Sequence, residues 1–208
     1  MCGIVGLYLK KPGLEGQLGK LFEPMLQAMT DRGPDSAGFA IYGDEVAEGW
    51  VKLTLQATDT NYPWTTLMGQ LEGHLGCSLD WYQNASAAVL KVHTDEAAAR
   101  GALAELAPDV RIMSAGQSIE ILKGMGLPAE ISSRFGLAVM KGSHIIGHTR
   151  MATESAVTME AVTRSPPAPT CAWCTTARSP TTSACARYSS AKASASRPIT
   201  TPKWPPAT

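Results

Sequence analysis

The second residue of the chain is a cysteine, and a short apolar run from Gly3 to Leu9 follows it. Removal of Met1, which is usual before a small second residue, would leave Cys2 with a free α-amino group beside its own thiol. An α-amine has a pKa of about 7.7–8.0, so part of it is a neutral base near pH 7. A base held next to a thiol activates it as a nucleophile, and Gly3 would let a substrate approach the backbone. The alternative is a buried structural cysteine at the start of a strand.

Two polar stretches later in the chain are further candidates for a site. They are DRGPDSAG at residues 31–38 and GHTRMATES at residues 147–155. Taken alone, the first is typical of a helix end followed by a Gly-Pro-Asp turn. The second, taken alone, is typical of a strand end with a solvated arginine.

Other residues that could do chemistry carry weaker signals. His74 and Cys77 stand three apart, like a metal-binding pair, but no second pair has matching spacing, so packing is the expected role. His93 and His144 are expected to be structural. The sequence contains no phosphate-binding or dinucleotide-binding glycine motif. No metal and no cofactor are therefore expected.

The last part of the chain contains CAWC, from Cys171 to Cys174, and then Cys185. A zinc site would need a fourth ligand, and no His, Asp or Glu follows residue 160. A redox CxxC would need a strand–helix–strand context that the surrounding residues do not supply. A non-catalytic, truncated fragment with an incidental metal-binding tail stays open as an alternative function.

The elements that must position these residues can be predicted from hydrophobic periodicity. Strands are expected at residues 2–9, 37–43, 49–57, 85–94 and 109–116, a strand running into a polar loop at 143–156, and a strand or short helix at 118–128. Helices are expected at residues 18–33, 95–107 and 129–136. The close spacing of the strands argues against a purely doubly wound sheet and predicts an α+β fold.

Composition divides the chain near residue 160. All 18 acidic residues, all 19 glycines and all four histidines lie in residues 1–160. Residues 161–208 are mostly Ser, Thr, Ala and Pro, and we expect them to be a low-complexity, irregular tail without a core. A net charge of zero argues against nucleic-acid binding. The absence of an apolar run of spanning length and of a signal peptide predicts a cytoplasmic protein without membrane contact.

In order, MCGI, RGPDS and GHTR-x-AT resemble the signature of class II glutamine amidotransferases, the family with an N-terminal nucleophile. Among its subfamilies, the chain looks most like amidotransferase subunits of the glutamate-synthase type, such as those of N-methylglutamate synthase. The resemblance implies an incomplete domain over residues 1–160. That domain would be the N-terminal part of an αββα sandwich, with a small α/β insertion over about residues 57–140.

The resemblance also implies roles for individual residues. Cys2 would attack the side-chain amide of glutamine, form a thioester, release ammonia, and be freed by water with release of glutamate. Arg150 would hold the α-carboxylate of glutamine, and Thr153 would add a contact to the same group. Arg32 and Asp35 would be framework residues near the nucleophile. The ammonia would pass to a partner synthase subunit.

Three elements that the family carries after this point are missing: His-Pro-Phe, His-Asn-Gly and an Asp-Thr-Glu-like element. A one-base shift of the reading frame, with suitable synonymous codons, restores all three in order. They arise from Thr163–Pro167, Cys171–Ala177 and Ser196–Pro206. The Trp173–Cys174 junction leaves no freedom, because TGG followed by TG forces valine. We therefore predict that the tail is translated out of frame.

A frameshift would remove the Asn and Gly that form the family's oxyanion hole. Loss of one such donor costs about 2.7–4 kcal/mol in the transition state. The expectation is a chain with little or no glutaminase activity, whose in-frame parent is active.

Overall fold

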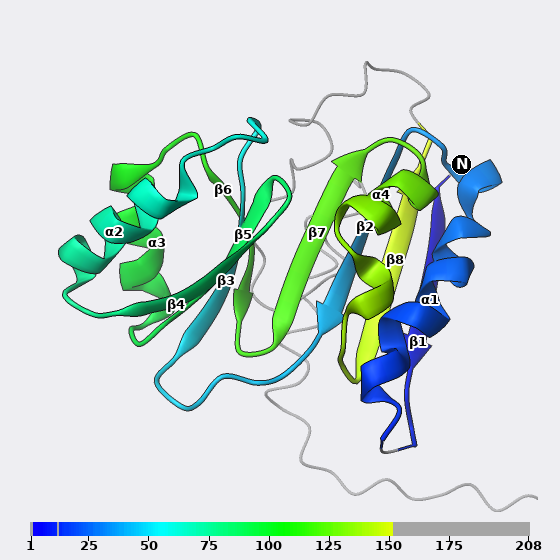
Figure 1. Ribbon diagram of the computed structural model, residues 1–208, viewed down its shortest axis with the longest axis horizontal. Coiled ribbons are helices and arrows are strands. Elements are labelled where there is room, and N and C mark those ends of the chain that lie inside the picture. The colour runs from blue at the N-terminus through cyan, green and yellow to red at the C-terminus, as the bar shows by residue number, and fades with distance from the viewer. Residues whose placement is uncertain (1, 12, 152–208) are drawn as a thin grey trace, which may run out of the picture. The chain divides into compact units, whose positions relative to one another are not determined.

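In the computed structural model, the described residues are 2–11 and 13–151, and they form an α+β fold, as predicted. The strands and helices alternate irregularly along the chain (Figure 1). All strand pairs within the two sheets are antiparallel.

The first sheet contains the strands that carry the predicted site. Its order is β1-β8-β2-β7. The strands are β1 (Gly3–Tyr8), β2 (Ser36–Tyr42), β7 (Ile119–Met125) and β8 (His144–Arg150). Helices α1 (Leu18–Gln27) and α4 (Pro128–Arg134) pack on one face, which we call the helix face. Short 3-10 helices at Glu15–Gln17, Thr30–Arg32 and Leu137–Val139 connect these elements.

Side chains alternate between the two faces of this sheet, and the apolar ones on the helix face pack against α1 and α4. Phe39, Leu122 and Ile145 are buried in one cluster with the apolar side of α1. Gly147 lies beneath that helix, and a Cβ there would stand 2.8 Å from Cζ of Phe22. A larger residue at position 147 would therefore push α1 away from the sheet.

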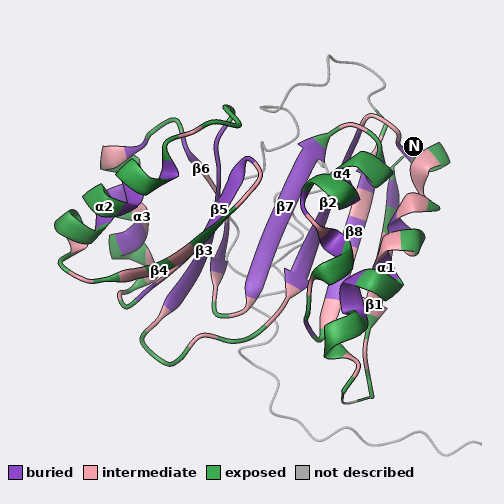
Figure 2. Cartoon of the chain, in the orientation of Figure 1, coloured by how far each residue is buried: buried purple, intermediate pink, exposed green. Residues whose placement is uncertain are grey.

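The second sheet has the order β4-β5-β3-β6. Its strands are β3 (Val51–Gln56), β4 (Leu79–Asn84), β5 (Ala87–Val92) and β6 (Arg111–Gly116). Helices α2 (Trp64–Leu75) and α3 (Glu96–Leu106) cover one face and share a separate hydrophobic core with it. Figure 2 shows the buried residues concentrated on the strands and on the inward sides of the helices.

Local capping interactions set where the two helices that cover this sheet begin and end. The side chain of Asp95 accepts a hydrogen bond of 2.8 Å from the amide of Ala98, which caps the start of α3. Gly76 ends α2 in the left-handed conformation, with φ of 66°, which favours glycine.

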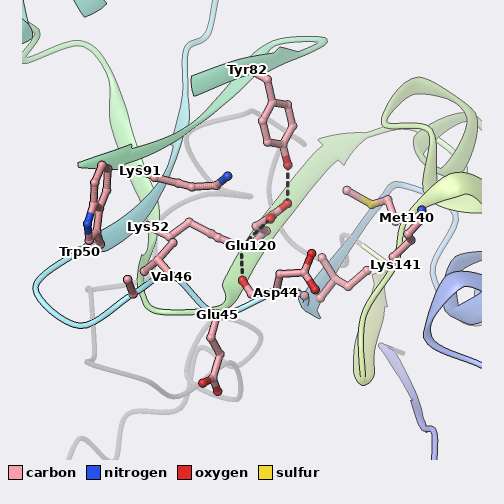
Figure 3. Close-up of a pocket in the computed structure, with 13 residues that line it drawn as sticks. Asp44, Glu45, Val46, Trp50, Lys52, Tyr82, Lys91, Glu120, Met140 and Lys141 are labelled. Carbon is pink, nitrogen blue, oxygen red and sulfur yellow. Dashed lines mark hydrogen bonds and ion pairs between the residues drawn. The ribbon is translucent and has the colours of Figure 1, made fainter. Parts of the chain in front are cut away.

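The two sheets lie within one compact unit and are joined by polar contacts. Lys52 of β3 forms a buried ion pair of 3.1 Å with Glu120 of β7, and Tyr82 of β4 donates a 2.8 Å hydrogen bond to the same carboxylate. Gln56 donates a 2.8 Å hydrogen bond to the carbonyl of Lys123, at the edge of β7. The Lys52–Glu120 pair lines a pocket of about 420 Å³ (Figure 3).

Two details differ from the sequence-based expectations. Helix α2 and strand β4 were not predicted. Helix α1 ends at Gln27 rather than continuing toward Gly33, because a 3-10 turn at Thr30–Arg32 follows it. The segment at 118–128, for which a strand or a short helix was predicted, forms strand β7.

The predicted domain limits stay predictions. Residues 51–116 build the second sheet and its helices, whereas β7 and α4 belong to the first sheet. The predicted boundary at residue 160 and the tail at 161–208 lie outside the described residues. Within residues 2–11 and 13–151, each helix is too short or too polar to traverse a lipid bilayer.

Candidate active site

Cys2 lies at the exposed end of β1, immediately before the first residue that pairs with β8. This exposure contradicts the alternative of a buried structural cysteine. Gly3 pairs with Thr149, and a Cβ at position 3 would lie 3.1 Å from Oγ1 of Thr149 and 3.2 Å from Cβ of Arg32. Glycine therefore lets β1 run close against β8 and the 30–32 turn, which brings the start of β1, next to Cys2, beside the end of β8.

Arg150 is the last residue of β8 and lies directly opposite Ser36 of β2. It also forms a β-bridge with Pro34, and its carbonyl accepts a 3.1 Å hydrogen bond from the amide of Asp35. Gly33 makes this approach possible, because a Cβ there would stand 2.5 Å from the backbone nitrogen of Arg150. The stretches at 31–38 and 147–151, far apart in sequence, thus meet beside Cys2.

Asp35 and Arg32, for which a framework role was predicted, make backbone hydrogen bonds near the start of β1. The Asp35 carbonyl accepts a 3.0 Å hydrogen bond from Gly126, which connects the 31–38 stretch to the turn after β7. Arg32 is exposed, and its amide donates a 3.0 Å hydrogen bond to the carbonyl of Met29. These contacts hold the backbone near Cys2, while the framework role itself stays a prediction.

Some predicted residues fall outside the part of the chain that the structure describes. Thr153 is one, and the cysteines at 171, 174 and 185 are others. Met151, which occupies a position where the resemblance leads us to expect an aromatic residue, is exposed at the end of the described segment.

Strand pairing sorts the side chains of the first sheet between two faces. Paired residues share a face, and successive residues alternate. Because Thr149 lies on the helix face, Arg150 lies on the opposite one, which we call the Cys2 face after the residue that precedes Gly3. Two rows of it run across the strands; the first is Arg150, Ser36 and Met125, and the second is Ile4, His148, Gly38 and Lys123.

The Cys2 face bears cationic and titratable basic groups from the described strands β2, β7 and β8. Glu120 is the one acidic residue in the four strands, and its pairing with Ile41 puts it on the helix face. Arg150, His148 and Lys123 all lie on the Cys2 face. Within these strands, that face is therefore suited to a negatively charged group.

Burial sets the protonation of two groups here that the sequence analysis missed. Burial lowers the pKa of Lys123 to about 8. The pKa of His148 is lowered to about 4, mainly by burial and then by the nearby Lys123, although a hydrogen bond with the backbone of Gly38 acts against this. His148 is thus neutral at pH 7. The sequence could have identified His148, because it lies two residues before Arg150 in the same predicted strand. Lys123 could be identified only from the pairing of β7 with β2.

The remaining histidines make packing contacts. The ring of His144 stacks on Tyr42 with centroids 4.0 Å apart, and burial lowers its pKa. His93 contacts Trp50 edge to face. His74 lies 3.8 Å from Glu105. Among the described residues, no group of three His, Cys, Asp or Glu side chains is placed to hold a metal.

Two curated proteins are similar to the chain. It is 50% identical over 159 residues to the "Glutamine amidotransferase-like protein GlxB" of Rhizobium meliloti (strain 1021), which covers 76% of this chain and 52% of the relative. It is 29% identical over 177 residues to a "Putative glutamine amidotransferase" of Methanothermobacter thermautotrophicus (strain Delta H), which covers 76% of this chain and 54% of the relative.

The chain spans about half the length of the curated relatives it matches. No protein-family model matches it. Together, the two relatives support a glutamine amidotransferase family for this chain.

Proposed function

We propose that the chain carries the glutaminase half-reaction of a class II glutamine amidotransferase. The Cys2 thiol attacks the side-chain amide carbon of glutamine, and its own α-amine takes the thiol proton and passes it to the leaving nitrogen. Ammonia departs and a glutamyl thioester remains. Water then attacks the thioester, which releases glutamate and restores the thiol. The proposal requires Cys2 to be the first residue of the mature chain.

One observation carries this proposal: three stretches that are distant in sequence converge on the exposed thiol. The end of β1 lies beside the end of β8, and the 33–36 segment lies against Arg150 through the Asp35 hydrogen bond and the Pro34 bridge. Arg150 is then the natural group to hold the α-carboxylate of glutamine, because a guanidinium binds a carboxylate through two parallel hydrogen bonds. Thr153 follows three residues later and is proposed to contact the same carboxylate.

Activity of this particular chain is proposed to be impaired. The relatives match 76% of the chain, a share close to the length of the predicted domain at residues 1–160. The tail beyond residue 160 has no Asp, Glu, Gly or His. An out-of-frame tail explains both the matched share and the composition of the tail. It would also remove the oxyanion donors that the family places after residue 160. The ammonia acceptor is proposed to be a synthase subunit.

The test compares two purified proteins: the chain as it stands, and a version whose frame is restored by one base between about codons 158 and 163. The restored protein should release glutamate from glutamine, and Cys2→Ser should abolish that release. The chain as it stands should be slower by a factor of about 100 or more, because one missing oxyanion donor already costs that much.

Each outcome decides one part of the proposal. Equal turnover by the two proteins would overturn the impairment. Absence of turnover by the restored protein would overturn the glutaminase function and favour a non-catalytic fragment. If the gene's bases permit no one-base restoration of the family's continuation, the frameshift is wrong.

A further inference from the structure

A buried hydroxyl lies beside Arg150. Ser36 is 1% exposed, and its Oγ has no hydrogen-bond partner among the described residues. Because Ser36 is paired directly with Arg150, the two side chains lie next to each other on the Cys2 face. A buried hydroxyl without a partner costs free energy, so its presence next to an arginine calls for a ligand that accepts its hydrogen bond.

A buried lysine reaches toward the same place. A Cβ at Gly38 would stand 2.5 Å from Cγ of Lys123 and 3.0 Å from Cε1 of His148. The lysine on β7 therefore extends across β2, in space that only glycine leaves free, toward the histidine on β8. Lys123 is 2% exposed. Burial of the Lys123 ammonium group costs solvation free energy. The side chain runs along the row of His148 and Gly38, which is next to the row that contains Arg150.

We propose that Ser36 and Lys123 complete, together with Arg150, a binding site for the α-carboxylate of the amino-acid substrate held at Cys2. This inference rests on the proposed function. Neighbouring strands are about 4.8 Å apart, so β1 and β2 are separated by about 10 Å, with β8 between them. A thiol on the residue before β1 and a carboxylate over β8 and β2 are thus spaced to suit the two ends of an extended glutamine.

The charges around Lys123 agree with a carboxylate ligand. His148 and Arg150 face it from β8, and Gln56 of β3 contacts its backbone carbonyl. His148 is neutral at pH 7. A carboxylate would accept a charge-assisted hydrogen bond from the lysine and one from the serine hydroxyl.

The test measures how fast Cys2 in the full chain is alkylated by iodoacetate, an anion, and by iodoacetamide, its neutral counterpart, with Cys2 followed by peptide mapping. Lys123→Met should lower the iodoacetate-to-iodoacetamide rate ratio about threefold to tenfold. Lys123→Arg should retain the ratio of the unaltered chain. Lys141→Met removes an exposed lysine at the other end of the sheet and should leave the ratio unchanged.

A merely structural lysine would alter both alkylation rates together, so an unchanged ratio in Lys123→Met would overturn the proposal. If that variant does not fold, Lys123→Gln replaces it. Ser36→Ala should weaken the protection of Cys2 by glutamine without changing the ratio as much, and unchanged protection would remove Ser36 from the site.

The failure of this inference is distinguishable from failure of the proposed function. An electrophilic glutamine analogue that labels Cys2 equally in the unaltered chain and in Lys123→Met would retain the function and overturn the carboxylate site. Absence of analogue labelling, together with a Lys123-dependent alkylation ratio, would retain an anion site and overturn the glutaminase.

Discussion

Replacement of Lys123 by methionine should change how the free energy of unfolding depends on pH. The lysine is buried, and its pKa in the folded chain is lowered to about 8 from its ordinary value of 10.5. The unfolded chain therefore binds more protons at this site than the folded chain between these two values. Stability must rise as pH increases through 8, because unfolding is coupled to proton uptake there. Methionine has no proton to exchange, so this rise should be lost.

The size of the effect follows from the shift. A pKa difference of one unit corresponds to about 1.4 kcal/mol, so the complete shift amounts to about 3 kcal/mol. The unfolding experiment can use only the pH range between about 8 and 9.5. Over this range the free energy of unfolding should rise by about 2 kcal/mol. The upper limit is set by Tyr82, because burial and Glu120 raise the pKa of its phenol. Above the ordinary pKa of tyrosine, its own titration would begin to destabilise the fold.

The assay is urea unfolding of the unaltered chain and Lys123→Met at several pH values between about 7.5 and 9.5. The unaltered chain should gain about 2 kcal/mol relative to Lys123→Met over this range. Parallel stability curves would show that Lys123 does not titrate below its ordinary range, and would refute the account of its burial.

Three further predictions concern stability, measured by urea unfolding or thermal melting. The folded pKa of His148 is below its ordinary value, so stability should fall by about 2.6 kcal/mol as pH drops from about 6.5 to 4, and His148→Gln should flatten this fall. Glu120→Gln leaves Lys52 buried without its carboxylate and should cost about 3 kcal/mol or more, whereas replacing both by methionine should cost less. Gly147→Ala should destabilise by about 1–3 kcal/mol by pushing α1 outward, whereas Gly73→Ala, in open space on α2, should be neutral or stabilising. Equal effects of the two glycine substitutions would contradict the packing argument.

Sequence periodicity predicted most of the elements of the first sheet, because its strands alternate and its α1 helix has a clear apolar side. It missed α2, although Trp64, Leu67 and Leu71 are buried at helical spacing. Gly69 and Gly73 on the exposed side of that helix lower its intrinsic propensity and hide the pattern. Strand β4 was missed because its residues alternate weakly and are only partly buried.

The candidate site was predictable where the chemistry is local and unpredictable where it depends on strand pairing. Cys2, Arg32, Asp35 and Arg150 were identified from short stretches of sequence. Lys123 could not be, because its reach toward His148 depends on the pairing of β7 with β2 and on the missing side chain at Gly38. That pairing joins Gly38 to Lys123, residues that are far apart in the sequence, and no local pattern encodes it.

The most direct test of the central claim is the covalent labelling of Cys2 by an electrophilic analogue of glutamine, followed by peptide mapping. The account predicts one adduct on Cys2, with Met1 removed, which forms more slowly when glutamine is present or when Arg150 is replaced by glutamine. An unlabelled Cys2, or labelling that neither glutamine nor the Arg150 substitution affects, would contradict the assignment of this thiol as the nucleophile of a glutamine site.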